Sequence, residues 1–320
     1  MARKLWFVSL ALFASSAAFA QQARTTAEVD KTTQTDDVRF KNEQNDRLTV
    51  PVRLSGSGPY RFLVDTGSDR TAVSRELAAK LKLEAGDAAQ VHGIAGVTTV
   101  ATASVPDLQL TRKQVKVVDA PLLESANIGA DGILGVDSFR SQRIMFDFEA
   151  HTLSIVPSAT PDFREEPGTI VVQGRRRNGR LIVTEAMANG LPVTVVIDTG
   201  SQVTVGNAAL RRALTKDKQL TGPLQQVELE SVTGQRIPGE YMFVRQLDVG
   251  GIGLKGLAIV FADAHTFKQL QLTQKPALLL GMNAMRAFKK VSIDFANRRL
   301  RVIVPEQSSL ETRMAAAGLN

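Results

Sequence analysis

The segment Asp65-Thr66-Gly67-Ser68 recurs 133 positions later as Asp198-Thr199-Gly200-Ser201. Each copy follows a short apolar run, at residues 62–64 and 193–197. A carboxylate at the end of a buried strand is costly unless hydrogen-bond donors surround it. The following glycine lets the backbone turn sharply and bring an N–H group close to that carboxylate. The repetition therefore predicts two carboxylates held in equivalent surroundings for a chemical purpose.

The similarity extends beyond the two tetrapeptides. Both copies share later residues at the same spacing, namely Thr71 with Thr204, Leu77 with Leu210, and Leu81 with Leu214. Further on, Ile133-Leu134-Gly135 has a counterpart in Leu279-Leu280-Gly281. Asp147 and Asp294 also lie in matching segments, now 147 positions apart, so the second copy carries about fourteen inserted residues. The chain is an internal duplication.

The first twenty residues differ in character from the rest of the 320-residue chain. A basic start at Arg3 and Lys4 precedes an apolar stretch at 5–13 and the small-residue site Ala18-Phe19-Ala20. This is the pattern of a secretory signal peptide at residues 1–20. The apolar stretch is shorter than the ~20 residues that a membrane-spanning helix needs. We therefore expect a periplasmic or secreted mature chain that begins at Gln21 and has no transmembrane anchor.

Composition is that of a globular protein, with 43% hydrophobic and 22% charged residues. The net charge of +7 is concentrated in Arg175 to Arg177 with Arg180, and in Arg298, Arg299 and Arg301. No aromatic residues are interleaved with these arginines, which favours a solvated surface over nucleic-acid binding. The chain has no cysteine, so it has no disulfide framework and must be stabilised by packing, with enough length for two modest cores.

The repeat sets the predicted domain organisation. Polar composition indicates a disordered leader at 21–45, and a segment at 158–178 with Pro, Gly and Arg indicates a linker. The lobes are then 46–157 and 179–306, followed by a tail at 307–320. Helical spacing is found mainly at 74–81, at 207–214 and after Gly281, whereas most other segments are short Val- and Ile-rich runs. We expect an all-β protein with short helices, built as two similar lobes.

With these motifs, the chain resembles the aspartic proteases of the pepsin and retropepsin class, in particular exported bacterial retropepsin-like proteins with two copies in one chain. The resemblance implies two β-barrel lobes, related by a pseudo-twofold axis, around a central cleft. Each lobe would contribute one catalytic aspartate, Asp65 and Asp198. The segments at 133–135 and 279–281 would cross beneath the catalytic turns. No cofactor or metal is implied.

The resemblance also gives a role to each residue that follows an aspartate. The threonines should brace the two loops against each other across the lobe interface. The glycines should donate backbone N–H groups to the carboxylates, and the serine hydroxyls should hydrogen-bond the outer carboxylate oxygens. These supporting residues are Thr66, Gly67 and Ser68 in the first copy and Thr199, Gly200 and Ser201 in the second.

Two glycine-containing segments occupy the places where this family has flaps that cover the cleft. The first spans 91–98 and includes Gly93, Ile94, Ala95 and Gly96; the second spans 231–235 and includes Thr233 and Gly234. Two flaps would be similar to retropepsins, since pepsins have one. The alternative is that each segment is an ordinary hairpin turn.

Other motifs are less persuasive. Residues 251–256 match the dinucleotide-binding string G-x-G-x-x-G, but a strand-like run follows where that site requires a helix. His92, His151 and His265 are scattered in sequence, which argues against a histidine metal site or a Ser-His-Asp triad. Asp147 and Asp294 are expected in turns or on the surface.

In the aspartic proteases, two neighbouring carboxylates share a proton. The ionised carboxylate acts as general base on a water and the protonated one as general acid, without a covalent intermediate. We therefore expect a monomeric endopeptidase that acts on peptides or proteins. Two alternatives stay open: a non-catalytic peptide- or protein-binding module on the same fold, and a processing enzyme whose leader, residues 21–47, blocks the cleft until it is removed.

Overall fold

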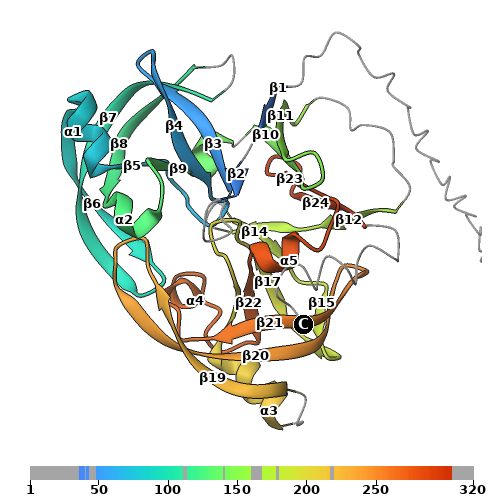
Figure 1. The fold of residues 1–320 in the computed structure, drawn as a ribbon. Helices are drawn as coiled ribbons and strands as arrows, with labels where there is room; N and C mark the ends of the chain where they lie inside the picture. Colours follow the sequence, from blue (N-terminus) through green and yellow to red (C-terminus); the bar gives the residue numbers. More distant parts are fainter. Residues whose placement is uncertain are drawn as a thin grey trace, which may run out of the picture.

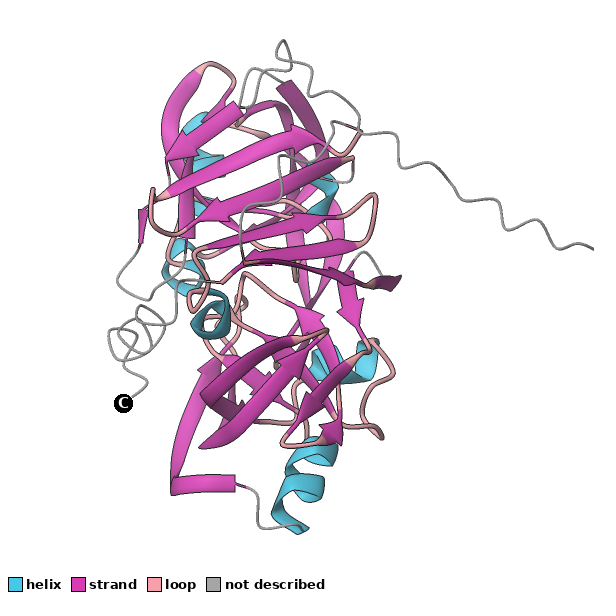
Figure 2. Cartoon of the chain, turned by 90° about the vertical axis from the view of Figure 1, so that its right-hand side faces the viewer, coloured by secondary structure: helices cyan, strands magenta, loops and turns pink. Residues whose placement is uncertain are grey.

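The computed structural model describes residues 36–39, 41–42, 48–110, 114–139, 141–159, 168–177, 180–216 and 220–304. The expected signal peptide at 1–20 and the tail at 307–320 lie outside these ranges. Two β-rich lobes and a third sheet that joins them make up the fold (Figures 1 and 2). The prediction of an all-β, bilobal protein is confirmed.

The first lobe is a strongly bent sheet whose strands, within the described ranges, follow the order β2, β3, β4, β9, β5, β8, β7, β6. An additional pairing between β3 and β7 curls the sheet toward a barrel. In chain order the strands are β2 (Lys41–Asn42), β3 (Leu48–Leu54), β4 (Ser57–Val64), β5 (Ala72–Ser74), β6 (Glu84–Gly93), β7 (Gly96–Gln109), β8 (Gln114–Leu123) and β9 (Gly132–Leu134). The short helices are α1 (Arg75–Leu81), α2 (Ser125–Ile128) and the 3-10 turn η1 (Val136–Ser138).

The second lobe repeats this plan. Its described strands follow the order β13, β14, β17, β22, β18, β21, β20, β15, β16, with β19 paired to β20. Their bounds are β13 (Arg175–Arg177), β14 (Arg180–Val183), β15 (Ala186–Ala188), β16 (Leu191–Pro192), β17 (Thr194–Ile197), β18 (Thr204–Gly206), β19 (Leu220–Glu230), β20 (Arg236–Val249), β21 (Ile252–Phe261) and β22 (Ala277–Leu280). The helices are α3 (Ala208–Lys216), α4 (His265–Gln269) and α5 (Met282–Met285).

A third sheet joins the lobes. Among the described strands its order is β1, β11, β10, β23, β24, β12. The bounds are β1 (Asp36–Arg39), β10 (Gln142–Asp147), β11 (Thr152–Pro157), β12 (Thr169–Gln173), β23 (Lys290–Asp294) and β24 (Arg299–Ile303). The central pair, β10 and β23, is antiparallel and sets Arg143 opposite Asp294. The two hairpins that end the repeats therefore meet in one sheet.

Two of the expected boundaries need correction. Within the expected disordered leader, residues 36–39 pair with β11 and residues 41–42 pair with β3. Within the expected linker, β12 pairs with β24 over its whole length, and Arg175 to Arg177 pair with β14. Polar segments can form edge strands because the ladder uses backbone groups, which composition does not reveal.

The helices after the tetrapeptides form where their spacing predicts, and each has a polar cap. Ser74 accepts a hydrogen bond from the N–H of Leu77 at 3.1 Å and caps α1. Asn207 accepts from the N–H of Leu210 at 2.8 Å at the start of α3. Such caps satisfy backbone donors that a helix start leaves without partners.

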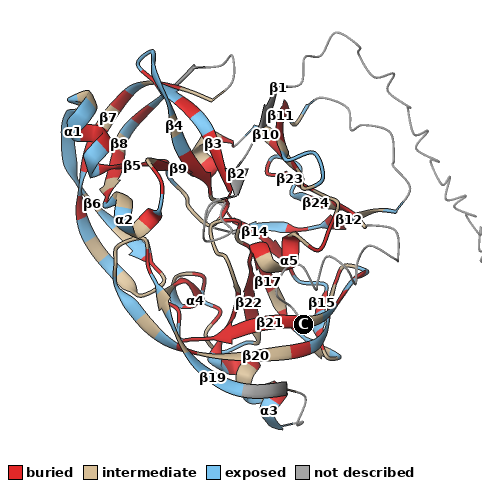
Figure 3. Ribbon diagram, viewed as in Figure 1, coloured by how far each residue is buried: buried red, intermediate tan, exposed pale blue. Residues whose placement is uncertain are grey.

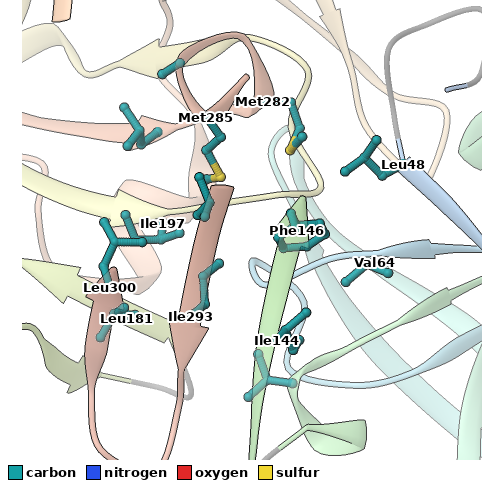
Figure 4. Packing of buried hydrophobic residues seen from close by; sticks show 14 of the residues in the cluster. Leu48, Val64, Ile144, Phe146, Leu181, Ile197, Met282, Met285, Ile293 and Leu300 are labelled. Atoms are coloured by element: carbon teal, nitrogen blue, oxygen red, sulfur yellow. The ribbon is translucent and has the colours of Figure 1, made fainter. Parts of the chain in front are cut away.

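The hydrophobic core is shared between the lobes, whereas the length of the chain predicts two separate cores. Buried residues are found in the interlobe sheet, in α5 and in the strands β17 and β22 (Figure 3). In the largest cluster, Phe146, Ile144 and Val64 of the first lobe lie beside Ile197, Met282 and Ile293 of the second (Figure 4). Smaller clusters line the cleft side of each lobe. Formation of the third sheet buries the repeat ends against each other, so the lobes fold around common contacts.

Across the described residues, no helix has the length and apolar character needed to cross a membrane.

Candidate active site

The two tetrapeptides follow β4 and β17, and in each lobe a strand from further along the chain runs beneath them. The strand β9 is parallel to β4 and antiparallel to β5, and β22 is parallel to β17 and antiparallel to β18. The backbone N–H of Asp65 donates to the carbonyl of Leu134 at 3.0 Å, and that of Asp198 to Leu280 at 3.1 Å. The prediction that these apolar segments cross beneath the turns is confirmed.

The two threonines interlock the turns across the lobe interface. The hydroxyl of Thr66 accepts from the N–H of Thr199 at 3.0 Å and donates to the carbonyl of Ile197 at 3.2 Å. The hydroxyl of Thr199 accepts from the N–H of Thr66 at 3.0 Å and donates to the carbonyl of Val64 at 2.7 Å. Both side chains are buried, at 2% exposure each, so these four bonds fix the relative position of the turns. This prediction is also confirmed.

The glycines bring each carboxylate against the opposite lobe. The N–H of Gly67 donates to Asp65 Oδ1 at 2.7 Å, and the N–H of Gly200 donates to Asp198 Oδ1 at 3.1 Å. A β-carbon added to Gly67 would lie 2.5 Å from Asp198 Oδ1, and one added to Gly200 would collide with the carboxylate of Asp65. Each turn therefore needs glycine because the other lobe's carboxylate occupies that space.

The serines do not act as expected from the resemblance. The Ser68 hydroxyl donates to the carbonyl of Arg70 at 2.8 Å, and the Ser201 hydroxyl donates to the carbonyl of Val203 at 2.7 Å. A hydroxyl has a single proton to donate. In this structure that proton stabilises the turn and is not directed to the outer carboxylate oxygens.

A further layer of polar side chains supports each turn and differs between the lobes. In the first lobe, Asp137 accepts from the N–H and the hydroxyl of Thr71, at 2.9 and 2.7 Å. In the second, Asn283 accepts from the N–H and the hydroxyl of Thr204, at 2.9 and 2.8 Å. The amide of Asn283 also donates to the carbonyl of Ala258 at 2.9 Å. A carboxylate can only accept, whereas an amide does both.

Both carboxylates face one cavity of about 810 Å³ between the lobes. Its walls include β-strand residues beside each turn, the short helices α2 and α4, and the hairpins β6–β7 and β19–β20. A volume of this size is in the range of pockets that hold small organic ligands or several residues of a peptide.

Comparison with known proteins places this arrangement in a family. The sequence model described as "Aspartyl protease" matches residues 50–138 and 184–284, which include both tetrapeptides and both supporting strands. The chain belongs to the aspartyl protease family. No curated protein matches the chain.

The aspartyl protease cleft is covered by two hairpins at the places predicted for flaps. The first flap is the β6–β7 hairpin, whose two-residue turn, Ile94-Ala95, lies between Gly93 and Gly96. The second flap is the β19–β20 hairpin, with its turn at residues 231–235, including Thr233 and Gly234. In Figure 1 the first flap reaches α4 of the second lobe and the second flap reaches α2 of the first. A role for these residues in substrate binding stays a prediction.

Arg180 lines the cleft, whereas its sequence surroundings predict a solvated surface. It is 5% exposed, and its Nε donates to the carbonyl of Gly67 at 2.8 Å. Its Nη1 lies 3.9 Å from a carboxylate oxygen of Asp69. One signal could have identified it, since Arg180-Leu181 lies 133 positions after Arg47-Leu48, at the repeat spacing. The exposed neighbours Arg175 and Arg176 agree with the expectation.

Two of the histidines, which are scattered in the sequence, lie together where the first flap of the aspartyl protease meets α4, and His92 lines the cavity. Nδ1 of His92 is 3.1 Å from Nε2 of His265, and the rings are stacked with centroids 5.4 Å apart. One residue belongs to the first flap and the other begins α4. Burial, followed by the charges of His92 and Lys268, lowers the pKa of His265 below its ordinary value of 6.5.

The remaining motifs have structural roles. Residues 250–251 form the tight turn between β20 and β21, and the strand β21 follows where a dinucleotide site would need a helix. Asp147 accepts from the N–H of Ala150 at 2.8 Å, and Asp294 accepts from the N–H of Asn297 at 2.9 Å. Both aspartates thus stabilise turns, although Asp294 is buried rather than on the surface.

Proposed function

We propose that this member of the aspartyl protease family is an active endopeptidase of the retropepsin-like kind. Asp65 and Asp198 are the catalytic residues of the proposed reaction. The observation that supports it best is the reciprocal packing of each carboxylate against the opposite lobe's glycine, which directs both acids to one point in the cleft floor.

The proposed chemistry needs one proton shared between the two aspartates. The ionised carboxylate takes a proton from a water molecule as that water attacks the scissile carbonyl carbon, and the protonated carboxylate donates to the carbonyl oxygen. A second proton transfer then reaches the amide nitrogen as the tetrahedral intermediate breaks down. The N–H groups of Gly67 and Gly200 hold the carboxylates in place for both steps.

The substrate is an extended peptide that lies between the floor and the two flaps. The flap strands offer backbone groups to which a peptide can pair as an added strand. Since one chain supplies both aspartates, we propose that the monomer is the active unit. We also propose that residues 1–20 direct export, so that the enzyme acts in the periplasm or outside the cell.

The test is to incubate the chain from Gln21 onward with a peptide library from about pH 3 to pH 8, because a shared-proton pair favours mildly acidic conditions. Cleavage products should be found for the natural chain and be missing for the Asp65→Asn/Asp198→Asn double variant. If the folded natural chain cleaves no peptide at any pH, the proposal is wrong and a binding role takes its place. If specific activity rises with protein concentration, the monomer proposal is wrong.

A further inference from the structure

The first flap is attached to the opposite lobe by three separate contacts at its tip. The N–H of His265, the first residue of α4, donates to the carbonyl of Ile94 at 2.7 Å. The Ile94 side chain packs against an apolar cluster of the second lobe. The rings of His92 and His265 stack beside these contacts and share a hydrogen bond of 3.1 Å.

The second flap is attached differently. Val232 at its tip packs against the apolar cluster of the first lobe, and Gly234 lies close to the side-chain amide of Asn127 on α2. At the tip position that matches His92, this flap has Glu230. No histidine lies in α2. The flaps thus share an apolar contact, and the histidine pair belongs to the first flap.

The histidine hydrogen bond depends on protonation. With both rings neutral, one ring nitrogen donates and the other accepts. One added proton is tolerated, since a charged ring can still donate to a neutral one. A second proton leaves two donors and two positive charges in contact, which is repulsive. The contact is therefore stable only while at least one ring is uncharged.

Among the surrounding charged groups, the nearest cation adds to this repulsion. On α4, Lys268 contributes positive charge near His265 and also pairs with Asp263 at 3.5 Å. On the second flap, Glu228 and Glu230 line the same cavity, and both are bridged to Arg236 at 3.5 and 3.2 Å. On the cleft floor lie the two aspartates and Arg180. Arg236 therefore already pairs with both glutamates of the second flap and competes with charged histidines for them.

We propose that the first flap is a pH-dependent lid: the His92–His265 contact holds it against α4 while at least one of the two rings is uncharged, and a second proton on the pair opens it. Closure lowers the pKa of His265, so the closed form binds protons less tightly than the open form. The part of the contact's stability that comes from His265 is fully present above the ordinary pKa of 6.5 and is lost as the pH falls through the lowered pKa of this ring. Acidification therefore favours the open cleft. The proposed proton-sharing pair also favours mildly acidic conditions.

The first test measures the flap directly and needs no catalysis. Because the chain has no cysteine, spin labels can be placed at Val97→Cys on the first flap and Gln274→Cys beyond α4 without other changes. The distance between the labels should be short and uniform at about pH 7.5, with a longer population at about pH 5. Because the closed form binds protons at His265 less tightly than the open form, we expect the closed-to-open ratio to fall between these two pH values.

Three variants separate the pair from general acid effects. His92→Gln and His265→Gln keep a hydrogen-bonding side chain but cannot leave two charged rings in contact, so each should keep the flap closed at about pH 5. His151→Asn removes the third histidine, which lies in the turn between β10 and β11, and should open like the natural chain. A flap that opens equally in all three variants would overturn the proposal.

Hydrogen exchange provides a second, independent measurement. The amide of residue 265 is bonded to the flap, whereas the amide of Leu270 is bonded within α4 to Thr266 at 3.0 Å. On acidification, protection at residue 265 should fall relative to Leu270 after correction for the intrinsic effect of pH. If both fall together, α4 itself unfolds and the lid proposal is wrong. An inactive enzyme would contradict the proposed function without changing either flap measurement.

Discussion

The two halves of this aspartyl protease are nearly identical where they meet and differ with distance from that point. The paired threonines, the glycines against the opposite carboxylates and the strands beneath the turns have matching hydrogen bonds in both lobes. Around them, Asp137 corresponds to Asn283, Ser74 to Asn207, and the flap residue His92 to Glu230. The comparison teaches that the symmetry is kept around the two aspartates, while the side chains that support the turns differ between the halves.

The strictest test of the symmetry compares the two aspartates singly. Asp65→Asn and Asp198→Asn should each lower kcat on a cleaved peptide by about 10³-fold or more, because either change removes one partner of a two-residue acid–base system. Thermal unfolding should show that both variants fold. Appreciable activity in one variant and not in the other would mean that the lobes contribute unequally to the reaction.

Replacement of the two helix-cap residues should change the free energy of unfolding by clearly different amounts. Asn207 is buried, and its side chain makes four hydrogen bonds, to the N–H groups of Leu210 and Ala277 and to the carbonyls of Leu272 and Lys275. We expect Asn207→Ala to lower the free energy of unfolding by about 3–4 kcal/mol. Urea denaturation monitored by circular dichroism measures this value.

The matched change in the first lobe is Ser74→Ala, which removes one cap bond to Leu77. Its expected cost is about 1 kcal/mol, the usual value for an N-cap. Equal costs for the two variants would show that the additional bonds of Asn207 contribute nothing to stability.

Replacement of either threonine should lower the free energy of unfolding by the same amount. Thr66→Val and Thr199→Val each remove a buried hydroxyl and leave an N–H and a carbonyl of the opposite lobe without that partner. We expect a loss of about 2–3 kcal/mol in the free energy of unfolding for each. Thr66→Ser and Thr199→Ser keep the hydroxyl and serve as controls. A difference between the two valine variants larger than their individual errors would contradict the symmetric bracing.

Modest and unequal effects are expected when the residues that support Thr71 and Thr204 are exchanged. Asn283→Asp removes the N–H donor to the carbonyl of Ala258 and places a carboxylate oxygen next to that carbonyl oxygen. We expect this change to lower the free energy of unfolding by about 2 kcal/mol. Asp137→Asn exchanges a charged acceptor of the Thr71 bonds for a neutral one, at a cost of about 1 kcal/mol. Urea unfolding measures both costs, and two equal costs close to zero would show that the two side chains are interchangeable.

The repeated elements could be predicted from the sequence because the repeat supplied a second copy of each. The tetrapeptides, the strands that end at Leu134 and Leu280, and the helices after Ser74 and Asn207 all follow from matching positions and local patterns. The threonine bonds followed from the family resemblance. In each of these, local sequence and tertiary structure favour the same arrangement.

What could not be predicted depends on contacts between residues far apart in the chain. His92 and His265 are separated by 173 positions, and no periodicity connects them. Arg180 was misplaced because charge composition does not reveal a carbonyl group from the other lobe that its guanidinium can bind. The serine hydroxyls were misassigned because the choice between a carboxylate and a turn carbonyl depends on geometry of a few tenths of an ångström.

The continuous sheet through β10 and β23 also has an evolutionary consequence. In an enzyme assembled from two identical chains, every substitution enters the site twice and must suit both places. Here the halves are covalently one protein, so each position mutates alone. One half can acquire a sensor or a preference while the other preserves the ancestral arrangement, and the pairing of β10 with β23 keeps them together throughout.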